Sequence, residues 1–200
     1  MELDLEHQHA DRAYPVLASL VVPRPIAWVT TLNEDGSVNA APFSFFNVFG
    51  ANPPVVGFAP GDRESGEPKD TPRNIRRTHE FVVNLVDESV AQAMNQTAAT
   101  LPYGTSEITQ AGLSLAASTS IKTPRIAEAP ASLECREWGT LQIGGNRLVV
   151  GLVTRVHLRD ELLDPETLRI HTERYFPIGR MASPHWYCHT GDRFEMVRPE

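Results

Sequence analysis

Residues 24–47, which read RPIAWVTTLNEDGSVNAAPFSFFN, constrain the fold of this chain more than any other stretch. In an extended segment over residues 26–31, Ile26, Trp28 and Thr30 would point to one face and Ala27, Val29 and Thr31 to the other. The dipeptide Asp35-Gly36 interrupts the pattern, and an extended run resumes over residues 38–46. Asp-Gly between two extended runs indicates a hairpin, because glycine adopts positive φ without a Cβ clash. The stretch therefore predicts two paired antiparallel strands.

The two predicted strands carry an unusual number of small hydroxyl and amide side chains. These are Thr30, Thr31, Asn39, Ser44 and Asn47. Hydroxyls and backbone N–H groups at the ends of paired strands suit an anionic, planar ligand. The alternative is that these side chains simply occupy polar strand positions, and the residues alone leave both interpretations open.

The length of 200 residues predicts one domain with a substantial core. A hydrophobic fraction of 41% and a charged fraction of 22% are typical of a globular chain. The net charge of −7 argues against nucleic-acid binding, which usually requires a basic surface.

The ends and the cysteines predict a cytoplasmic protein. The first residues are acidic and polar, unlike a signal peptide. The sequence contains no run of about 18 apolar residues, so no membrane span is predicted. Cys135 and Cys188 form no metal-type cluster and are expected to be reduced thiols. His7 and His9 form an H-x-H pair in what is expected to be a solvated tail, so no metal site is expected there.

The rest of the chain predicts strands separated by turns, which the 16 prolines also favour. Residues 1–20 are expected to form an arm that includes a short helical turn. Further strands are predicted over residues 53–60, 81–86, 121–126, 131–143 and 147–158, and a helix over 88–98. No βαβ rhythm is present. This pattern predicts a mainly β protein, with an antiparallel sheet closed into a small barrel and two or three helices outside it.

Residues 70–78 predict a short helix that follows a polar loop over residues 61–69. We expect Asp70 or Thr71 to cap this helix, and Pro72 suits its first turn, where a missing N–H costs nothing. A helix N-terminus beside Lys69 is suited to bind an anion. The alternative is a capped surface helix with an isolated lysine.

Several kinds of catalytic motif are absent from the sequence. No GxGxxG follows a strand, no GxSxG is present, and residues 66–71 lack the spacing of a P-loop. Glu134 and Glu137 are expected to be surface charges rather than an acid–base pair. No catalytic side chain is therefore predicted.

Taken together, the segments RPIAWVTTLNEDGSVNAAPFSFFNVF, PPVVGF and KDTPRNIRRTHEFVVN, followed by residues 131–135 and 151–153, resemble the flavin reductase-like family. The resemblance covers roughly residues 20–187 and includes the flavoredoxin-like branch. It implies a six-stranded antiparallel split β-barrel with a few peripheral α-helices, formed by a single domain over residues 1–200. It also implies a homodimer that binds FMN near the subunit interface. Phe43, Phe45 and Phe46 cannot all face one core, which independently favours a contact with a partner subunit or a ligand.

The resemblance also implies the cofactor contacts. Those expected along the flavin ring and ribityl chain are Thr30, Thr31, Ala41, Pro42, Phe43 and Ser44, with Phe45 and Asn47 completing the pocket. Those expected at the phosphate are Lys69, Asp70, Thr71 and Asn74. Arg180 and His157 are weaker candidates.

The implied activity is that of an NAD(P)H-dependent FMN reductase, in which hydride passes from the nicotinamide to flavin N5. The cofactor carries this chemistry, which agrees with the absence of a catalytic motif. A flavin-dependent monooxygenase or another redox protein would then be the partner. Two alternatives stay open: a flavoredoxin-like electron carrier with tightly bound FMN, and a flavin-binding module without catalysis.

Overall fold

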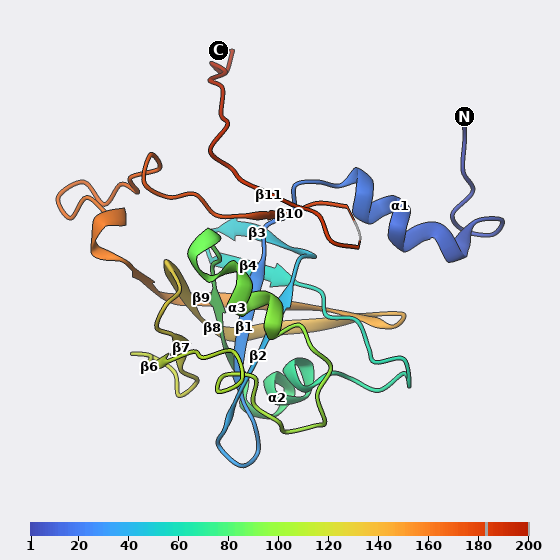
Figure 1. The fold of residues 1–200 in the computed structure, drawn as a ribbon, viewed down its shortest axis with the longest axis horizontal. Helices are drawn as coiled ribbons and strands as arrows, with labels where there is room; N and C mark the ends of the chain where they lie inside the picture. Colours follow the sequence, from blue (N-terminus) through green and yellow to red (C-terminus); the bar gives the residue numbers. More distant parts are fainter. Residues whose placement is uncertain (183, 200) are drawn as a thin grey trace.

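The computed structural model describes residues 1–182 and 184–199, and its centre is one antiparallel sheet of seven strands (Figure 1). In spatial order the strands are β2 (Val38–Phe43), β1 (Ala27–Leu32), β5 (Glu80–Asn84), β8 (Ala131–Ile143), β9 (Asn146–Leu158), β4 (Pro54–Phe58) and β3 (Phe46–Ala51). The expected hairpin is present: Leu32 pairs with Val38, and Gly36 in the turn has a φ of 86°. The mainly β, antiparallel fold is thus confirmed.

The two edge strands of this sheet, β2 and β3, are consecutive in the chain and are joined only by Ser44 and Phe45. The chain therefore passes directly from one edge of the sheet to the other, which curls the sheet into a barrel. The two edge strands do not pair with each other, so the barrel is split between them. The carbonyl of Phe45 accepts a hydrogen bond from the N–H of Ala59 at 2.8 Å, which holds the crossing segment beside β4.

The expected number of six strands is wrong, because residues 38–46 do not form one strand. The chain leaves β2 after Phe43 and begins β3 at Phe46, which pairs with Phe58 of β4. The link of Ser44 and Phe45 contains no glycine or proline, so the extended sequence pattern continues through the break. The expected strand over 121–126 is also shorter, since only Arg125–Ile126 (β7) pairs, with Leu115–Ala116 (β6).

The interior of the barrel holds one apolar cluster, formed by β1, β4, β5, β8 and β9 together with one helix residue, Ile75. The ring centroids of Phe58 and Phe81 are 5.5 Å apart in an edge-on arrangement, and Phe43 stacks on Phe58 at 5.2 Å. A Cβ on Gly151 would lie 2.3 Å from the Phe81 ring. Gly151 is thus the position at which β9 makes room for this core.

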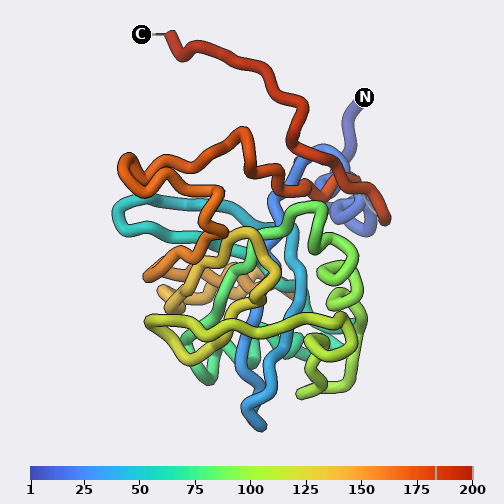
Figure 2. Tube along the Cα trace, turned by 60° about the vertical axis from the view of Figure 1, so that its left-hand side comes forward, coloured from blue at the N-terminus to red at the C-terminus, as the bar shows by residue number. Residues whose placement is uncertain are grey.

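A second apolar cluster lies on the outer face of β1 and β2, beneath η2 (Glu88–Val90) and α3 (Ala91–Gln96). Trp28 is fully buried there, and its Nε1 donates to Thr97 Oγ1 at 2.8 Å. The yellow-green segment after α3 crosses in front of the blue strands in Figure 2, and Thr30 Oγ1 donates to the carbonyl of Pro124 at 2.7 Å. The outer face of the hairpin is therefore covered.

The expected helix over residues 70–78 is confirmed as α2 (Asp70–Thr78). The remaining elements lie outside the barrel: η1 (Ala10–Arg12), α1 (Ala13–Leu20), η3 (Asp160–Leu162), β10 (Gly179–Arg180) and β11 (Tyr187–Cys188). Arg24 ties the ends of α1 and β10 to the link between β2 and β3, since its guanidinium donates to the carbonyls of Val21 and Met181 and to Ser44 Oγ. No helix in the described part of the chain has the length and apolar character needed to cross a membrane.

Candidate functional site

A cavity of about 780 Å³ lies between β2, the loop over residues 62–65, the start of α2 and the segment over residues 97–101. Its size falls within the range of small-molecule sites. Segments far apart in the sequence enclose it, because the hairpin brings β2 next to α2 and α3 brings the 97–101 segment back across the opening. The cavity is the candidate functional site.

The free edge of β2 forms one wall of this cavity, and three of its outward backbone positions are occupied or missing. Ser106 Oγ donates to the carbonyl of Val38 at 2.5 Å, and the N–H of Ala40 donates to Glu107 Oε2 at 2.9 Å. Pro42, the next residue that projects outward, has no N–H to offer. These features disfavour the addition of a further strand, and the edge presents Asn39, Ala41, Pro42 and Phe43 to the cavity.

The N-terminus of α2 forms the opposite wall and lacks a side-chain cap. The expectation that Asp70 or Thr71 caps the helix is wrong, because the extended residue Lys69 is the N-cap and makes no capping hydrogen bond. The Asp70 carboxylate instead accepts from Arg63 Nη2 at 2.8 Å, and Thr71 Oγ1 accepts from Asn39 Nδ2 at 3.0 Å. The first turn thus keeps its positive end and N–H groups available to an anion.

Arg63 adds a second feature that suits an anion. Its Nη1 donates to the carbonyl of Leu101 at 3.2 Å, and its guanidinium lies 3.7 Å from the ring centroid of Tyr103. Its Nε is buried and has no hydrogen-bond partner among the described residues. An unsatisfied buried N–H donor at a cavity is costly unless a ligand completes it. The sequence marked the surrounding loop as polar but gave no signal for Arg63 itself.

Glu107 is the other cavity residue that the sequence did not indicate. The residue is 6% exposed, and among the other described residues only the N–H of Ala40 donates to its carboxyl group. Burial raises its pKa above the ordinary value of a glutamate, and the nearby charge of Asp70 raises it further, although the hydrogen bond from Ala40 opposes both. A lone glutamate between Ser106 and Ile108 has no motif around it, so only the fold reveals its position.

Six of the twelve predicted cofactor contacts line the cavity. They are Ala41, Pro42, Phe43, Lys69, Asp70 and Thr71. Two more lie directly behind it: Asn74 Nδ2 donates to Thr31 Oγ1 at 3.1 Å, in a buried network that also holds Asn39. These eight residues are brought together by the fold, and their contact with a flavin stays a prediction.

The remaining four predicted contacts lie elsewhere. Thr30 faces the covered outer side of the hairpin, where its hydroxyl is used by Pro124. Ser44 and Phe45 form the link between the edge strands, where Arg24 Nε donates to Ser44 Oγ at 3.3 Å. Asn47 lines a separate, mainly apolar cavity of about 350 Å³ at the other side of the barrel.

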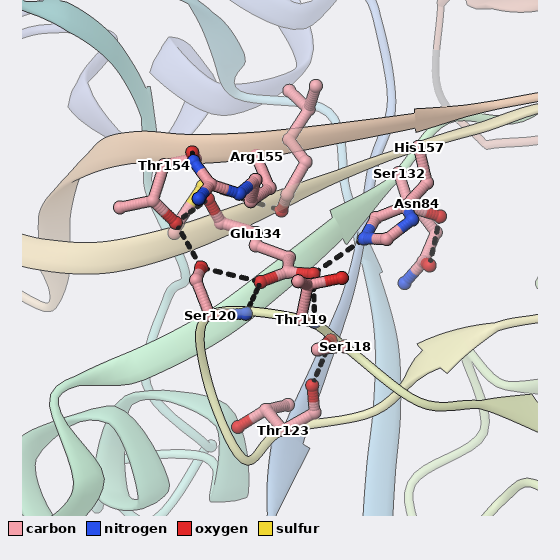
Figure 3. Close-up of polar contacts among 12 residues, drawn as sticks. Asn84, Ser118, Thr119, Ser120, Thr123, Ser132, Glu134, Thr154, Arg155 and His157 are labelled. Carbon is pink, nitrogen blue, oxygen red and sulfur yellow. Dashed lines mark hydrogen bonds and ion pairs between the residues drawn. The ribbon is translucent and has the colours of Figure 1, made fainter.

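The weaker candidates are also outside the main cavity. Arg180 lies over the Tyr187 ring and donates to the carbonyl of Pro184. His157 belongs to a polar cluster around Glu134, 2.5 Å from its carboxylate (Figure 3). Among the described residues no group of three or more His, Cys, Asp or Glu side chains is placed to hold a metal ion.

The expectation that Glu134 is a surface charge is wrong, because the side chain is completely buried. The loop over residues 118–123 covers it, and the N–H groups of Thr119 and Ser120 donate to its carboxylate at 2.6 and 2.7 Å (Figure 3). Ser120 Oγ adds a third hydrogen bond at 2.6 Å. Burial by itself raises the pKa of Glu134, but the hydrogen bonds from Ser120, His157 and Thr119 outweigh it and lower the pKa to about 2.

Comparison with known proteins gives the cavity a context. The family model described as flavin reductase like domain matches residues 19–179. An uncharacterized protein of Deinococcus radiodurans is 43% identical to this chain over an alignment of 206 residues. The alignment covers 97% of this chain and 91% of that protein.

Two solved structures are also similar over nearly their whole length. Nitrilotriacetate monooxygenase component B from Bacillus cereus has a TM-score of 0.92 and 37% identity over 98% of both chains. The 2-nitrobenzoate 2-nitroreductase of Pseudomonas fluorescens has a TM-score of 0.91 and 35% identity, over 100% of this chain and 96% of that one. With the split barrel and the family match, these similarities confirm the resemblance read from the sequence: the chain belongs to the flavin reductase-like family.

Proposed function

We propose that this protein is an FMN-dependent oxidoreductase that transfers hydride from NAD(P)H to the flavin. The observation that carries the proposal is the cavity of about 780 Å³, at which an uncapped helix N-terminus, Lys69 and the unsatisfied Nε of Arg63 converge. Three independent groups there favour an anion, in a chain whose net charge is −7. In a member of the flavin reductase-like family, these anion-binding groups are best explained as the site of the phosphate of FMN.

The residues of the cavity fit FMN at both of its ends. The N–H groups of Asp70 and Thr71, together with Lys69 and Arg63, would hold the phosphate, because charge-assisted hydrogen bonds are the stronger ones. Ala41, Pro42 and Phe43 line the wall of β2 with small or flat surfaces, against which the isoalloxazine ring would lie. The segment over residues 97–101 would cover the bound cofactor.

Bound FMN would supply a hydride-accepting N5 and an electron sink. The contribution of this chain is then to orient the ring and to limit its contact with water, which favours a productive approach of the nicotinamide. No side chain is required as an acid or a base for hydride transfer. This agrees with a cavity wall in which two carboxylates, Asp62 and Asp70, are each paired with an arginine.

The test is an absorbance spectrum of the purified protein loaded with FMN, recorded under anaerobic conditions before and after NADH and then NADPH are added. We expect the bands of oxidised flavin to bleach with at least one of the two nucleotides. Bands that persist with both nucleotides would contradict the reductase and favour the electron carrier. Failure to retain or bind FMN would contradict the flavin site itself.

The similar structures suggest two classes of electron acceptor, a nitroaromatic substrate and a partner monooxygenase. A nitroreductase and a monooxygenase component B are similar to this chain at 35% and 37% identity. We propose reduced flavin as the product that is handed to a monooxygenase partner. Turnover of NAD(P)H with free FMN in excess supports this assignment, whereas turnover that requires a nitroaromatic acid such as 2-nitrobenzoate would support direct reduction of a substrate.

We further propose a homodimer, because large apolar side chains are exposed on neighbouring parts of the barrel. Val48 and Phe49 of β3 are 65% and 61% exposed, and Trp138 of β8 is 64% exposed. Phe45, in the link between the edge strands, is exposed as well. Light scattering at micromolar concentration should give about twice the 22.1 kDa mass of one chain, and a monomer would contradict the assignment.

A further inference from the structure

Glu107 is the one buried carboxylate of the cavity that has no cationic partner among the described residues. The charged groups around the cavity are Asp62, Arg63, Glu64, Lys69 and Asp70. Asp62 pairs with Arg147 and Asp70 with Arg63, while Glu64 is exposed to solvent. Glu107 is 6% exposed and forms no ion pair in the described structure.

The hydrogen bonds of Glu107 are incomplete in the same way. Oε2 accepts from the N–H of Ala40 at 2.9 Å, and apart from its own backbone N–H no other described residue donates to the carboxyl group. An ionised carboxylate has about four acceptor positions, and burying it with only part of them filled is costly. The group therefore needs either a proton or a donor that enters the cavity.

The position of Glu107 indicates which part of a ligand it meets. The N–H that it binds belongs to Ala40, next to Asn39, whose side chain contacts Thr71 at the start of α2. Glu107 thus lies on the wall of β2 close to the end of the cavity that attracts an anion. In FMN, the part that adjoins the phosphate is the polyhydroxylated ribityl chain, which offers hydroxyl groups to a carboxyl side chain.

Resting on the function proposed above, we propose that Glu107 couples flavin binding to proton uptake. A phosphate bound at α2 brings up to two negative charges towards a carboxyl group that has no cation of its own. The neutral acid form is then favoured. In that form Oε2 still accepts from Ala40, and the acidic O–H donates to a hydroxyl of the ribityl chain. The direction of the pKa of Glu107, raised by burial and by Asp70, agrees with this role.

The experiment is calorimetric titration with FMN at pH 8, in two buffers that differ in ionisation enthalpy, which counts the protons taken up. At pH 8 the phosphate is already fully ionised, since its second pKa is about 6. We expect wild-type protein to take up more protons per FMN bound than Glu107→Gln takes up. Glu34→Gln is the matched control, because it removes an exposed carboxylate that does not line the cavity, and it should behave as wild type.

The pH dependence of affinity gives a second readout. Above the pKa of Glu107, the affinity of wild-type protein for FMN should fall by up to about tenfold per pH unit. The affinity of Glu107→Gln should change much less, and riboflavin, which lacks the phosphate, should show a smaller slope with wild type. Equal proton uptake and equal slopes in wild type and Glu107→Gln would overturn the proposal.

The remaining outcomes are also decisive. If Glu107→Gln does not fold, wild-type titrations repeated from pH 5 to pH 8 decide alone, because zero proton uptake throughout that range would overturn the role of Glu107. If wild-type protein binds no FMN at any pH, the flavin site is wrong rather than the role of Glu107. Flavin binding without a difference between the two proteins rejects only the role of Glu107.

Discussion

Two buried glutamates of this molecule have opposite environments. Glu134 is completely buried and receives hydrogen bonds from Thr119, Ser120 and His157, whereas Glu107 receives one, from Ala40. The pKa is lowered to about 2 for Glu134 and raised for Glu107. Glu134 holds a loop to the barrel, and Glu107 faces an open cavity.

The number of hydrogen-bond partners distinguishes a structural glutamate from a ligand-facing one more clearly than burial does, because both glutamates are buried. A satisfied buried charge is part of the fold, and its loss leaves other buried groups unpaired. When a buried charge beside a cavity lacks partners within the protein, we expect a ligand in the cavity to supply them. Arg63 belongs with Glu107 in this respect, because its buried Nε also lacks a partner among the described residues.

Removing Glu134 should have the largest effect of all. Glu134→Ala leaves the N–H groups of Thr119 and Ser120 without their acceptor and removes the partner of His157, and we expect the free energy of unfolding to fall by about 3 kcal/mol. Urea denaturation followed by circular dichroism measures the change. A loss below about 1 kcal/mol would mean that the loop over residues 118–123 is not held by this carboxylate.

Acid should destabilise wild-type protein partly through the same residue. The pKa of Glu134 falls from an ordinary 4.5 to about 2 on folding, so its ionised form contributes about 3 kcal/mol of stability. This contribution is complete above pH 4.5 and is lost as the pH falls towards 2. Glu134→Gln should therefore lose less stability than wild type between pH 5 and pH 3 in urea unfolding. Parallel pH profiles would contradict the lowered pKa.

Lys69→Ala should weaken the binding of FMN by about tenfold or more, equivalent to about 1.4 kcal/mol, and should leave riboflavin binding almost unchanged. The reason is that Lys69 lies at the cavity beside the uncapped N-terminus of α2, where the phosphate is expected. Fluorescence titration with both flavins measures the effect. Arg76→Ala is the control, since Arg76 is an exposed cation of the same helix that does not line the cavity. If Lys69→Ala weakened the binding of both flavins equally, the assignment of the phosphate to this site would be contradicted.

Glu107→Gln should change stability least, by less than about 1 kcal/mol near pH 7. The amide oxygen of glutamine still accepts from Ala40, and no other described partner is lost. Because the pKa of Glu107 is raised on folding, the contribution of this residue to stability is present at low pH and is lost as the pH rises through its folded value. The variant should therefore be slightly more stable than wild type at pH 8. A loss as large as that of Glu134→Ala would make Glu107 a structural residue.

Local patterns predicted most of the fold and part of the cavity. The Asp35-Gly36 turn, the strand predicted over residues 81–86 and observed as Glu80–Asn84, and the helix with Pro72 in its first turn each have strong signals within a few residues. Local signals also located Lys69 and Thr71 at a helix start. The link at Ser44 and Phe45 was missed, because the change from one sheet edge to the other uses no glycine or proline.

The two glutamates could not be placed from the sequence for a different reason. The period of a strand shows that Glu134 and Cys135 face opposite sides, but not that a loop 14 residues away covers the outer one. Glu107 reaches a strand edge that lies 67 residues earlier in the chain. Such positions depend on how distant segments pack, and that information is not contained in any short window of sequence.

A crystal structure of the protein with FMN would show directly whether the flavin binds in the cavity between Arg63, the start of α2 and Glu107. We expect the phosphate to lie within hydrogen-bond distance of Arg63 Nε and the N–H groups of Asp70 and Thr71, with the ribityl chain against Glu107 and with the Glu134 cluster unchanged. A flavin bound instead in the apolar cavity beside Asn47, with Arg63 Nε and Glu107 still without a ligand, would contradict it.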